Sequence, residues 1–473
     1  MKTHALSTRL ALNVAMLFGG ASLAQAPPPD DSAFRALYKQ LVEINTTRSV
    51  GSCTQAAQAM RARLLAAGIP ATDTQILAPP ERPQDGALIA VLHGRDAAAK
   101  PILLLAHIDV VEAQREDWER DPFKLVEEQG WFYARGASDD KAMAAVFTDT
   151  LIRYQQEGFK PRRDIKLALT CGEETPEIFN SVRWLTETQP AVLNALFALN
   201  EGAGGELDRD EKPVALQIQA GEKVYQDFAL EASDVGGHSS RPTKNNPIVR
   251  LSAGLVRLGA HNFPIALNQA TRAYFEAEAK LVSPASAADM RAVLNNPRDE
   301  AAAERLWAVN PGWNGSLRTT CVVTEITGGH APNALPQHVR ANVNCRILPG
   351  VPISEVQEEI TQALSDVKIS VATSGEAGMQ APPPPLSDRI MQPVRKVGSA
   401  IWPGVAVVPT MSTGATDGRF LNAAGVPTYG LSGMFHDAEG SHAHGLNERI
   451  RVKSLLDGRR FLYEVVKLYA NGA

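Results

Sequence analysis

Four short segments of the chain consist mainly of apolar residues: PILLLA (101–106), IKLALT (165–170), LFAL (196–199) and GVAVVP (404–409). Runs of this kind are typical of strands covered by helices on both faces of a sheet. Between them lie patterns of helical period, such as TQAAQAMRARLLAAG and DKAMAAVFTDTLIRYQQEG. This alternation predicts an α/β domain built on a central sheet.

From residue 222 to residue 376 the pattern changes. KVYQDFALEASD and TTCVVTEITGG…HVRANVNCRIL alternate like half-exposed antiparallel strands, and ISEVQEEITQALSD has the period of an amphipathic helix. We therefore expect an inserted α+β domain at 222–376, between two parts of the α/β domain at 27–221 and 377–473. The proline-rich APPPPL at 381–386 is interpreted as the linker that returns to the first domain.

Residues 1–26 carry Lys2 and Arg9 near their start, continue with a short apolar stretch and end in AQA. This order is typical of a signal peptide that is removed on export. A membrane anchor is the alternative, but the apolar stretch is short, contains Asn13 and is followed by PPPDD. We expect a mature chain that starts after Ala26, is exported to the periplasm or secreted, and has no membrane association.

The chain is mildly acidic, with a formal net charge of −5. Loss of residues 1–26 removes Lys2 and Arg9 and no acid, so the charge becomes −7. A protein of this charge without basic runs is a poor candidate for nucleic-acid binding. We expect no nucleic-acid partner.

The cysteines stand at positions 53, 171, 321 and 345 and show no C-x-x-C spacing, so they do not predict a thiolate metal site. Export permits disulfides, and Cys321 and Cys345 flank the predicted hairpin and are candidates to bond. Cys171 ends a predicted strand. A small buried packing residue is the simpler interpretation of Cys171, and a catalytic thiol is the alternative.

Polar residues follow the apolar runs directly. His107 and Asp109 come after the first run, Glu173 and Glu174 after the second, and Glu201 after the third. In open α/β sheets, ligands bind outside the carboxyl ends of the strands. These side chains are therefore expected at one edge of the sheet.

Imidazole with several carboxylates and no thiolate suits zinc or a similar divalent ion. GASDDK adds Asp139 and Asp140 to the carboxylates, and HAHGLNE adds His442 and His444 to the imidazoles. A surplus of acids suits two ions that share one carboxylate, roughly 3.5–4 Å apart. Each motif alone is weak, because paired glutamates are usually a solvated loop and His-x-Asp occurs by chance.

Six motifs occur in order along the chain: LLLAHIDVV, WFYARGASDDKAMAA, CGEET, GGHSSRP, GGHAPNALP…NCRILPG and HGLNE. On these motifs the chain resembles the zinc-dependent exopeptidases and deacylases that include glutamate carboxypeptidase, succinyl-diaminopimelate desuccinylase, carnosine dipeptidase and aminoacylase. The resemblance spans SVGSCTQAA to HGLNERI. It implies a mixed-sheet α/β dinuclear metallohydrolase domain with an inserted α+β domain that serves as lid and, in compact relatives, as dimer interface.

The resemblance also implies which residues bind metal. It assigns two divalent ions per chain, with Zn²⁺ favoured and Co²⁺ or Mn²⁺ as alternatives, to His107, Asp139, Glu174, Glu201 and His444. Asp139 would bridge both ions. Asp140 would support the site or cap the following helix, and His442 is the rival of His444.

Three further residues take roles in catalysis by the same resemblance. Glu173 would be the general base, and Asp109 would fix the ring of His107. His238, in GGHSSRP, would donate a hydrogen bond to the scissile carbonyl. The reaction implied is hydrolysis by a hydroxide held between two ions.

Substrate recognition is implied by two other motifs. Asn333 and Arg346 match the positions that clasp a substrate carboxylate, and Gly414 and Thr416 in STGATDGR would add donors beside it. The resemblance therefore implies cleavage of the amide bond next to a C-terminal amino acid with a free carboxylate. The enzyme would be a carboxypeptidase or an N-acyl-amino-acid amidohydrolase, acting on small peptides or N-acyl amino acids.

Two other functions compete with this prediction. A dipeptidase or aminopeptidase needs a clasp for a free amine, and Glu201 stands where aminopeptidase relatives tend to have Asp. An inactive exported binding protein is expected to lose the base first, yet Glu173 and all five ligands are present. A metal-dependent turnover test separates the two classes.

The stretch from His238 to Asn333 is long for this family. NQATRAYFEAEAKLV and SAADMRAVLNNPRDEAAAERLWAV have helical periods and are expected to be extra lid material. The insertion leaves open whether the lid forms a homodimer and whether His238 acts in its own subunit or in that of a partner.

Overall fold

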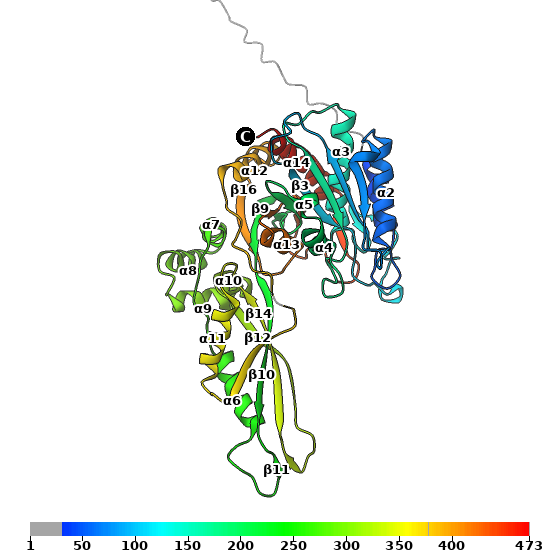
Figure 1. Cartoon of the computed structure of the whole chain (residues 1–473). Helices are drawn as coiled ribbons and strands as arrows, with labels where there is room; N and C mark the ends of the chain where they lie inside the picture. Colours follow the sequence, from blue (N-terminus) through cyan, green and yellow to red (C-terminus); the bar gives the residue numbers. More distant parts are fainter. Residues whose placement is uncertain (1–30, 377, 473) are drawn as a thin grey trace, which may run out of the picture.

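The computed structural model describes residues 31–376 and 378–472, so the predicted signal peptide at 1–26 lies outside the described residues. The described chain has two parts: a broad α/β body and a narrow lid that extends away from it (Figure 1). None of the helices in these ranges is long and apolar enough to cross a membrane.

A mixed sheet of ten strands forms the centre of the body. Its order is β1 (Thr74–Leu77), β2 (Ala87–Leu92), β6 (Ile165–Thr170), β3 (Ile102–His107), β7 (Ala198–Asn200), β17 (Thr428–Gly430), β9 (Pro213–Glu222), β8 (Gly205–Leu207) and β18 (Phe435–His436), with β16 (Ala406–Ser412) paired to β9. β3 runs parallel to both β6 and β7. The predicted α/β class with a mixed sheet is confirmed.

Helices cover both faces of this sheet. One face carries α1 (Ser32–Glu43), α2 (Cys53–Ala66), α3 (Lys141–Gln156), α12 (Asp388–Ile401) and α14 (Val452–Asn471), and the other carries α4 (Ser181–Thr188), α5 (Pro190–Leu193) and α13 (Gly418–Ala423). Along β3, Leu104 packs into the first core, whereas Leu103 and Leu105 pack into the second. Every position of the strand is therefore buried, which explains the continuous apolar run.

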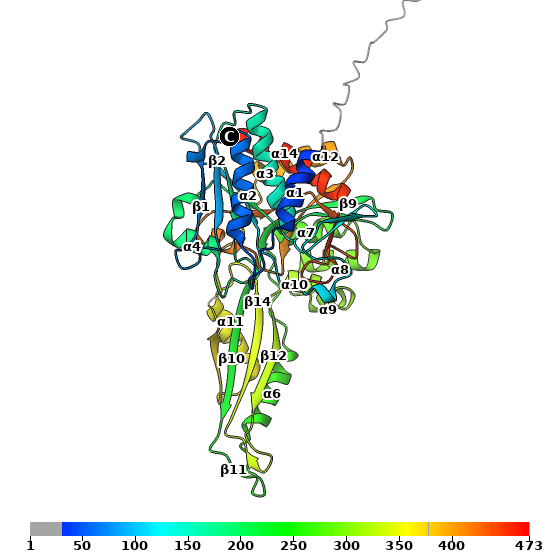
Figure 2. The ribbon, with the colours of Figure 1, turned by 90° about the vertical axis from the view of Figure 1, so that its right-hand side faces the viewer.

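The lid is an antiparallel sheet with the order β12 (Thr320–Gly328), β14 (His338–Ile347), β10 (Val224–Ser233) and β15 (Ile369–Ser374). Helices α6 (Pro247–Gly259) and α11 (Ile353–Leu364) pack on it around a separate core. At its far tip, β11 (Gly237–His238) pairs with β13 (Ala334–Leu335), as Figures 1 and 2 show. A disulfide joins Cys321 to Cys345 across β12 and β14, which confirms that predicted pair.

The extra helices do not lie in the lid, and that prediction was wrong. α7 (Gln269–Glu278), α8 (Pro284–Asn295), α9 (Glu300–Val309) and α10 (Pro311–Leu317) share a small core of their own, and α7 packs along β16 of the body. Ala270 joins the main core of the body. The helical period correctly identified apolar faces, but it does not specify which surface those faces meet.

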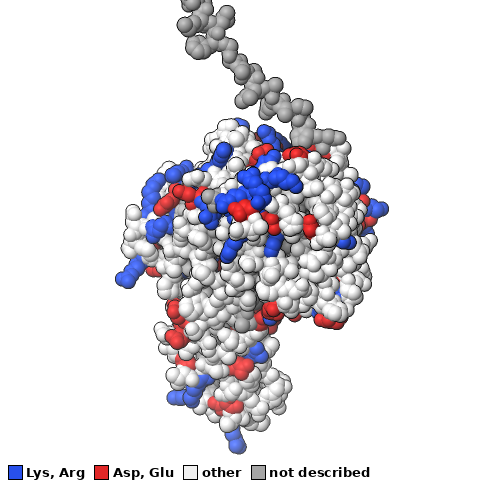
Figure 3. All heavy atoms as spheres, turned by 45° about the horizontal axis from the view of Figure 1, so that its top comes forward, with Lys and Arg blue, Asp and Glu red and all other residues white. Residues whose placement is uncertain are grey.

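A small sheet of β4 (Val126–Glu128), β5 (Trp131–Tyr133) and β19 (Arg449–Arg451) joins distant parts of the chain. β5 pairs with β19, so the segment before Asp139 lies beside the segment after His444. On the face of the molecule in Figure 3, Lys and Arg gather in the upper part with Asp and Glu among them.

Candidate metal centre

The side chains that follow the central strands lie together because those strands are parallel. His107 is the last residue of β3, Glu173 and Glu174 follow β6, and Glu201 follows β7. Two further residues reach this edge from loops: Asp139 lies just before α3, and His444 just before β19. The sequence therefore folds six predicted site residues onto one edge of the sheet.

Five of these residues form two groups that could each hold a metal ion: His107, Asp139 and Glu201 in one, and Asp139, Glu174 and His444 in the other. The ligand atoms within each group lie within 4.8 Å of one another. In the first, His107 Nε2 lies 3.0 Å from Asp139 Oδ1 and 3.7 Å from Glu201 Oε1. In the second, His444 Nε2 lies 3.2 Å from Asp139 Oδ2 and 2.9 Å from Glu174 Oε2. Each group thus uses a different oxygen of Asp139, as a bridging carboxylate requires.

The ring of His107 is oriented for metal binding. Its Nδ1 lies 3.1 Å from the backbone oxygen of Asp109, which can only accept, so Nδ1 donates and carries the proton. The lone pair of Nε2 then faces Asp139 and Glu201. Nitrogen and carboxylate oxygen donors in this arrangement suit Zn²⁺ and similar divalent ions, so the donor set fits the predicted metal.

Asp109 also holds the loop that carries the two glutamates. Its carboxylate accepts hydrogen bonds from the backbone amides of Glu173 at 3.4 Å and Glu174 at 3.1 Å. The turn before them requires glycine, because Gly172 has a φ of +90° and a Cβ there would meet the carbonyl oxygen of Phe179 at 2.1 Å. Asp109 therefore positions a metal ligand and the base through its carboxylate, and the ligand histidine through its backbone oxygen.

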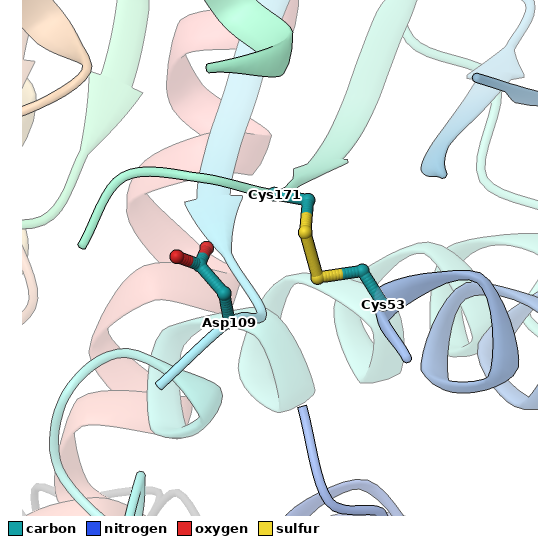
Figure 4. Close-up of side chains that lie close together, drawn as sticks. All are labelled: Cys53, Asp109 and Cys171. Carbon is teal, nitrogen blue, oxygen red and sulfur yellow. A yellow bond between two sulfur atoms is a disulfide. The ribbon is translucent and has the colours of Figure 1, made fainter. Parts of the chain in front are cut away.

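Cys171 is not a simple packing residue, and that interpretation was wrong. It forms a disulfide with Cys53, at the start of α2, beside the carboxylate of Asp109 (Figure 4). The 118 residues that separate the two cysteines hid this pairing from sequence reasoning. The bond ties the end of β6, and so the loop with Glu173 and Glu174, to the helix layer.

Glu448 is a site residue that the sequence reasoning missed. Its buried carboxylate accepts hydrogen bonds from Arg135 at 2.8 Å and from the backbone amides of Gly136, Ser138 and Asp139 at 2.8 to 3.0 Å. It fixes the loop of the bridging ligand to the loop that bears His444. The only signal was its place in the motif HGLNE.

Burial raises the pKa of Glu173, and the negative charges of Asp417 and Glu174 raise it further. The charge of His107 lowers this pKa. A raised pKa lets a carboxylate take up a proton near neutral pH, which suits a general base.

Asp417 is a second site residue that the sequence reasoning missed. It is buried and accepts hydrogen bonds from Asn180 at 2.5 Å and from Thr170 at 3.1 Å.

A cavity of about 730 Å³ opens beside this centre. Its wall includes Glu173, Glu174 and His444, and also Arg346 and Gly414. The guanidinium of Arg346 lies 4.7 Å from the ring centroid of Tyr225. Within residues 31–376 and 378–472, Arg346 forms no ion pair, so its charge faces the cavity without a carboxylate partner.

His238 and Asn333 do not reach this cavity in one chain. Both lie at the exposed tip of the lid, where the amide of Ser239 donates to the backbone oxygen of Asn333. β14 separates the tip from Arg346 by about 25 Å, at roughly 3.3 Å for each strand residue. A single chain therefore cannot clasp one carboxylate with both Asn333 and Arg346.

Three other predicted residues lie in separate positions. The hydroxyl of Thr416 is engaged by Asn200 at 3.0 Å and by the amide of Gly418 at 3.0 Å, and Thr416 is not in the cavity wall. Asp140 is buried at the N-terminus of α3 but makes no capping hydrogen bond with its side chain. His442 is exposed and belongs to neither metal-binding group.

Known proteins are similar to this chain in sequence and in fold. N-fatty-acyl-amino acid synthase/hydrolase PM20D1 of Mus musculus is 29% identical over 386 residues, which cover 80% of this chain and 75% of the relative. A metallo-carboxypeptidase of the M20 family from Sulfolobus solfataricus has a similar structure, with a TM-score of 0.67, 18% identity and coverage of 93% and 99%. A dinuclear metal-binding peptidase from Bacillus subtilis has a TM-score of 0.57, 11% identity and coverage of 92% and 98%.

The model of peptidase family M20/M25/M40 matches residues 103–468, well over half of the 473-residue chain. The matched range contains all five predicted metal ligands and the predicted base. The chain therefore belongs to peptidase family M20/M25/M40 and is a hydrolase of the metallopeptidase and amidohydrolase type.

Proposed function

We propose that this hydrolase cleaves the amide bond next to a C-terminal amino acid with a free carboxylate, as a carboxypeptidase or an N-acyl-amino-acid amidohydrolase. The observation that carries this proposal is Arg346, which lines the same cavity as Glu173 and has no carboxylate partner in the described chain. The planar fork of arginine binds a carboxylate through two hydrogen bonds. A carboxylate held there directs the adjacent amide bond towards Glu173.

Two divalent ions, with Zn²⁺ favoured, would be held by His107, Asp139 and Glu201 on one side and by Asp139, Glu174 and His444 on the other. When bound, such ions supply the Lewis acidity that activates water and polarises an amide carbonyl at neutral pH. The protein's part is to fix the donors. Asp109 and Glu448 do so from behind the ligands.

Glu173 acts as the base in this proposal. Its side chain lies in the cavity wall beside Glu174, and it forms no hydrogen bond within the described part of the chain that would occupy its oxygens. It takes the proton of the attacking water and later delivers it to the nitrogen that leaves. The two adjacent glutamates thus have different roles: Glu174 binds metal, and Glu173 transfers the proton.

His238 is proposed to serve the site of a second subunit. The amide of Ser240 donates to His238 Nδ1 at 3.1 Å, so in the neutral ring Nε2 carries the proton and can donate to a carbonyl oxygen. Because the lid tip is remote from its own cavity, this role requires a homodimer formed through the lid. Asn333, beside His238 on the tip, would reach the partner's substrate carboxylate in the same way.

We also propose that the mature protein is exported to the periplasm or secreted. Residues 1–26 have the sequence of a signal peptide. The two disulfides add support, because such bonds form and persist in oxidising compartments.

The relatives support both substrate types. The mouse relative bears the name of an N-fatty-acyl-amino acid synthase/hydrolase, and the structural neighbour from Sulfolobus solfataricus that of a carboxypeptidase. In both names the free carboxylate of an amino acid is the shared chemistry. The acyl group or the preceding residue is the part that differs.

A panel of N-acyl amino acids and dipeptides, each as free acid and as C-terminal amide, tests the proposal with zinc added. We expect hydrolysis of free acids and a loss of at least about 100-fold on the amides, because the guanidinium loses its partner. Equal rates on both forms would exclude the clasp. No turnover on the whole panel, despite bound metal, would favour a binding protein.

A further inference from the structure

Lys223 is a buried cation at the wall of the same cavity. It follows β9, and its side chain is 1% exposed. Its ammonium group has three donors, but the one hydrogen bond that it makes in the described chain is to Thr320 Oγ1, at 3.3 Å. A buried charge needs a partner, and residues 31–376 and 378–472 contribute no ion pair to it.

The lid sheet brings Lys223 close to Arg346. Thr320 on β12 and Tyr225 on β10 both stand directly opposite Arg346 on β14. Directly opposite residues project from the same face, with Cβ atoms about 5 Å apart. Because the amine of Lys223 bonds to Thr320, the ammonium and the guanidinium converge on one part of the cavity wall.

The positive charges of Lys223 and Arg346 are not neutralised by an ion pair within the described chain. Burial lowers the pKa of Lys223 to about 7, and the charge of Arg346 acts in the same direction. Two acids of the cavity wall, Asp227 and Glu222, form no ion pair with either cation in the described chain. Asp227 accepts hydrogen bonds from Tyr225, Asn342 and Asn344. Oε2 of Glu222 accepts from the amide of Thr416, and its buried Oε1 has no hydrogen-bond partner in the described chain.

We propose that Lys223 is a second substrate-binding residue, whose amine and the Arg346 guanidinium together hold the free carboxylate of the C-terminal amino acid. A carboxylate has two oxygens and about four acceptor sites, so it can receive the fork of Arg346 and an N–H of Lys223 at once. This inference rests on the proposed function and names a residue that the motifs did not indicate.

The test compares Lys223→Met and Lys223→Arg with the wild type on one N-acyl amino acid and its C-terminal amide, with zinc present. Methionine keeps the length and burial of the side chain but removes the charge. We expect Lys223→Met to lower kcat/KM on the free acid by about 10- to 100-fold, mainly through KM, and to change the rate on the amide by less than about twofold. Lys223→Arg should recover part of the loss.

Lys166→Met is the matched control. Lys166 is half-buried, and its amine donates to the carbonyl oxygens of Ala191, Val192 and Asn194, outside the cavity wall. We expect it to lower the melting temperature and to leave the ratio of free-acid to amide rates unchanged. Melting temperature and metal content are measured for every variant.

Two results would overturn the inference. One is an equal loss on acid and amide in Lys223→Met, which would make Lys223 a structural residue that supports Thr320. The other is an unchanged acid preference in a folded, metal-loaded Lys223→Met. In both cases a wild type that still prefers free acids leaves the proposed function standing, whereas a wild type without that preference removes the clasp itself.

Discussion

The edge of the central sheet and the tip of the lid both carry predicted site residues, yet the fold holds them in opposite ways. At the sheet edge, His107 is almost fully buried, and Asp139 is fixed through its amide by the buried Glu448. At the tip, His238 is exposed on a strand of two residues that pairs with Ala334 and Leu335. The contacts at the edge come from several segments and are buried, whereas those at the tip come from one short, exposed strand pair.

This difference shows what each region needs in order to work. Ligands of one ion must stay within a few ångströms of each other, so the body fixes them with buried contacts between strands and loops. A donor on the lid is useful only when it is brought to a cavity, so its own surroundings can remain open. We therefore expect changes to the metal ligands and their buried supports at the edge to alter folding and metal content, and changes at the tip to alter turnover alone.

The largest effect is expected from the two disulfides. Loop-closure entropy predicts about 5 kcal/mol for Cys53–Cys171, which closes 118 residues, and about 3.5 kcal/mol for Cys321–Cys345, which closes 24. Paired replacement by serine at 53 and 171 should also lower metal content, because that bond anchors the loop of Glu174. Denaturant unfolding and metal analysis measure both effects. Equal metal loss in the lid variant would contradict the comparison.

The second-largest effect is expected from Glu448→Gln. The change removes the charge opposite the buried Arg135 and offers an amide where Ser138 and Asp139 donate. Breaking a buried pair in this way costs about 3 to 5 kcal/mol. Glu439→Gln is the control, because its pair with Arg449 is exposed and such pairs contribute about 1 kcal/mol or less. Similar melting temperatures for the two variants would show that the loops do not depend on Glu448.

The third prediction separates the adjacent glutamates. Glu173→Gln should keep its metal and lose at least about 100-fold in turnover, because it removes only the base. Glu174→Gln should lose metal and regain part of its activity in excess zinc. If zinc instead rescued Glu173→Gln, the roles of base and ligand would be reversed.

The last prediction concerns the tip. His238→Ala should leave melting temperature and metal content unchanged and lower turnover by about 100-fold, the effect of removing one oxyanion donor. Mixing it with Glu173→Gln subunits should restore activity, because a mixed dimer contains one site with both intact groups. No recovery after verified subunit exchange would mean that His238 does not act across a dimer.

Much of the site was predictable because its residues follow strands. His107, Glu173, Glu174 and Glu201 come directly after apolar runs, and parallel strands end at one edge. Glu448 was not predictable in this way, because its partner Asp139 lies 309 residues earlier and only the pairing of β5 with β19 brings them together. The bond of Cys171 to Cys53 was not predictable either, because 118 residues separate the two cysteines.

The sequence by itself determined the α/β class, the antiparallel strands within the inserted segment, the family and the kind of donors at the centre, because strand period, helix period and motif order can be read along the chain. Only the tertiary structure decided that α7 lies against β16, that His238 and Asn333 stand remote from Arg346, and that Lys223 faces the same cavity. Those outcomes depend on which surfaces remain uncovered after the sheets form. Packing between distant segments settles that question, and a local pattern carries no information about it.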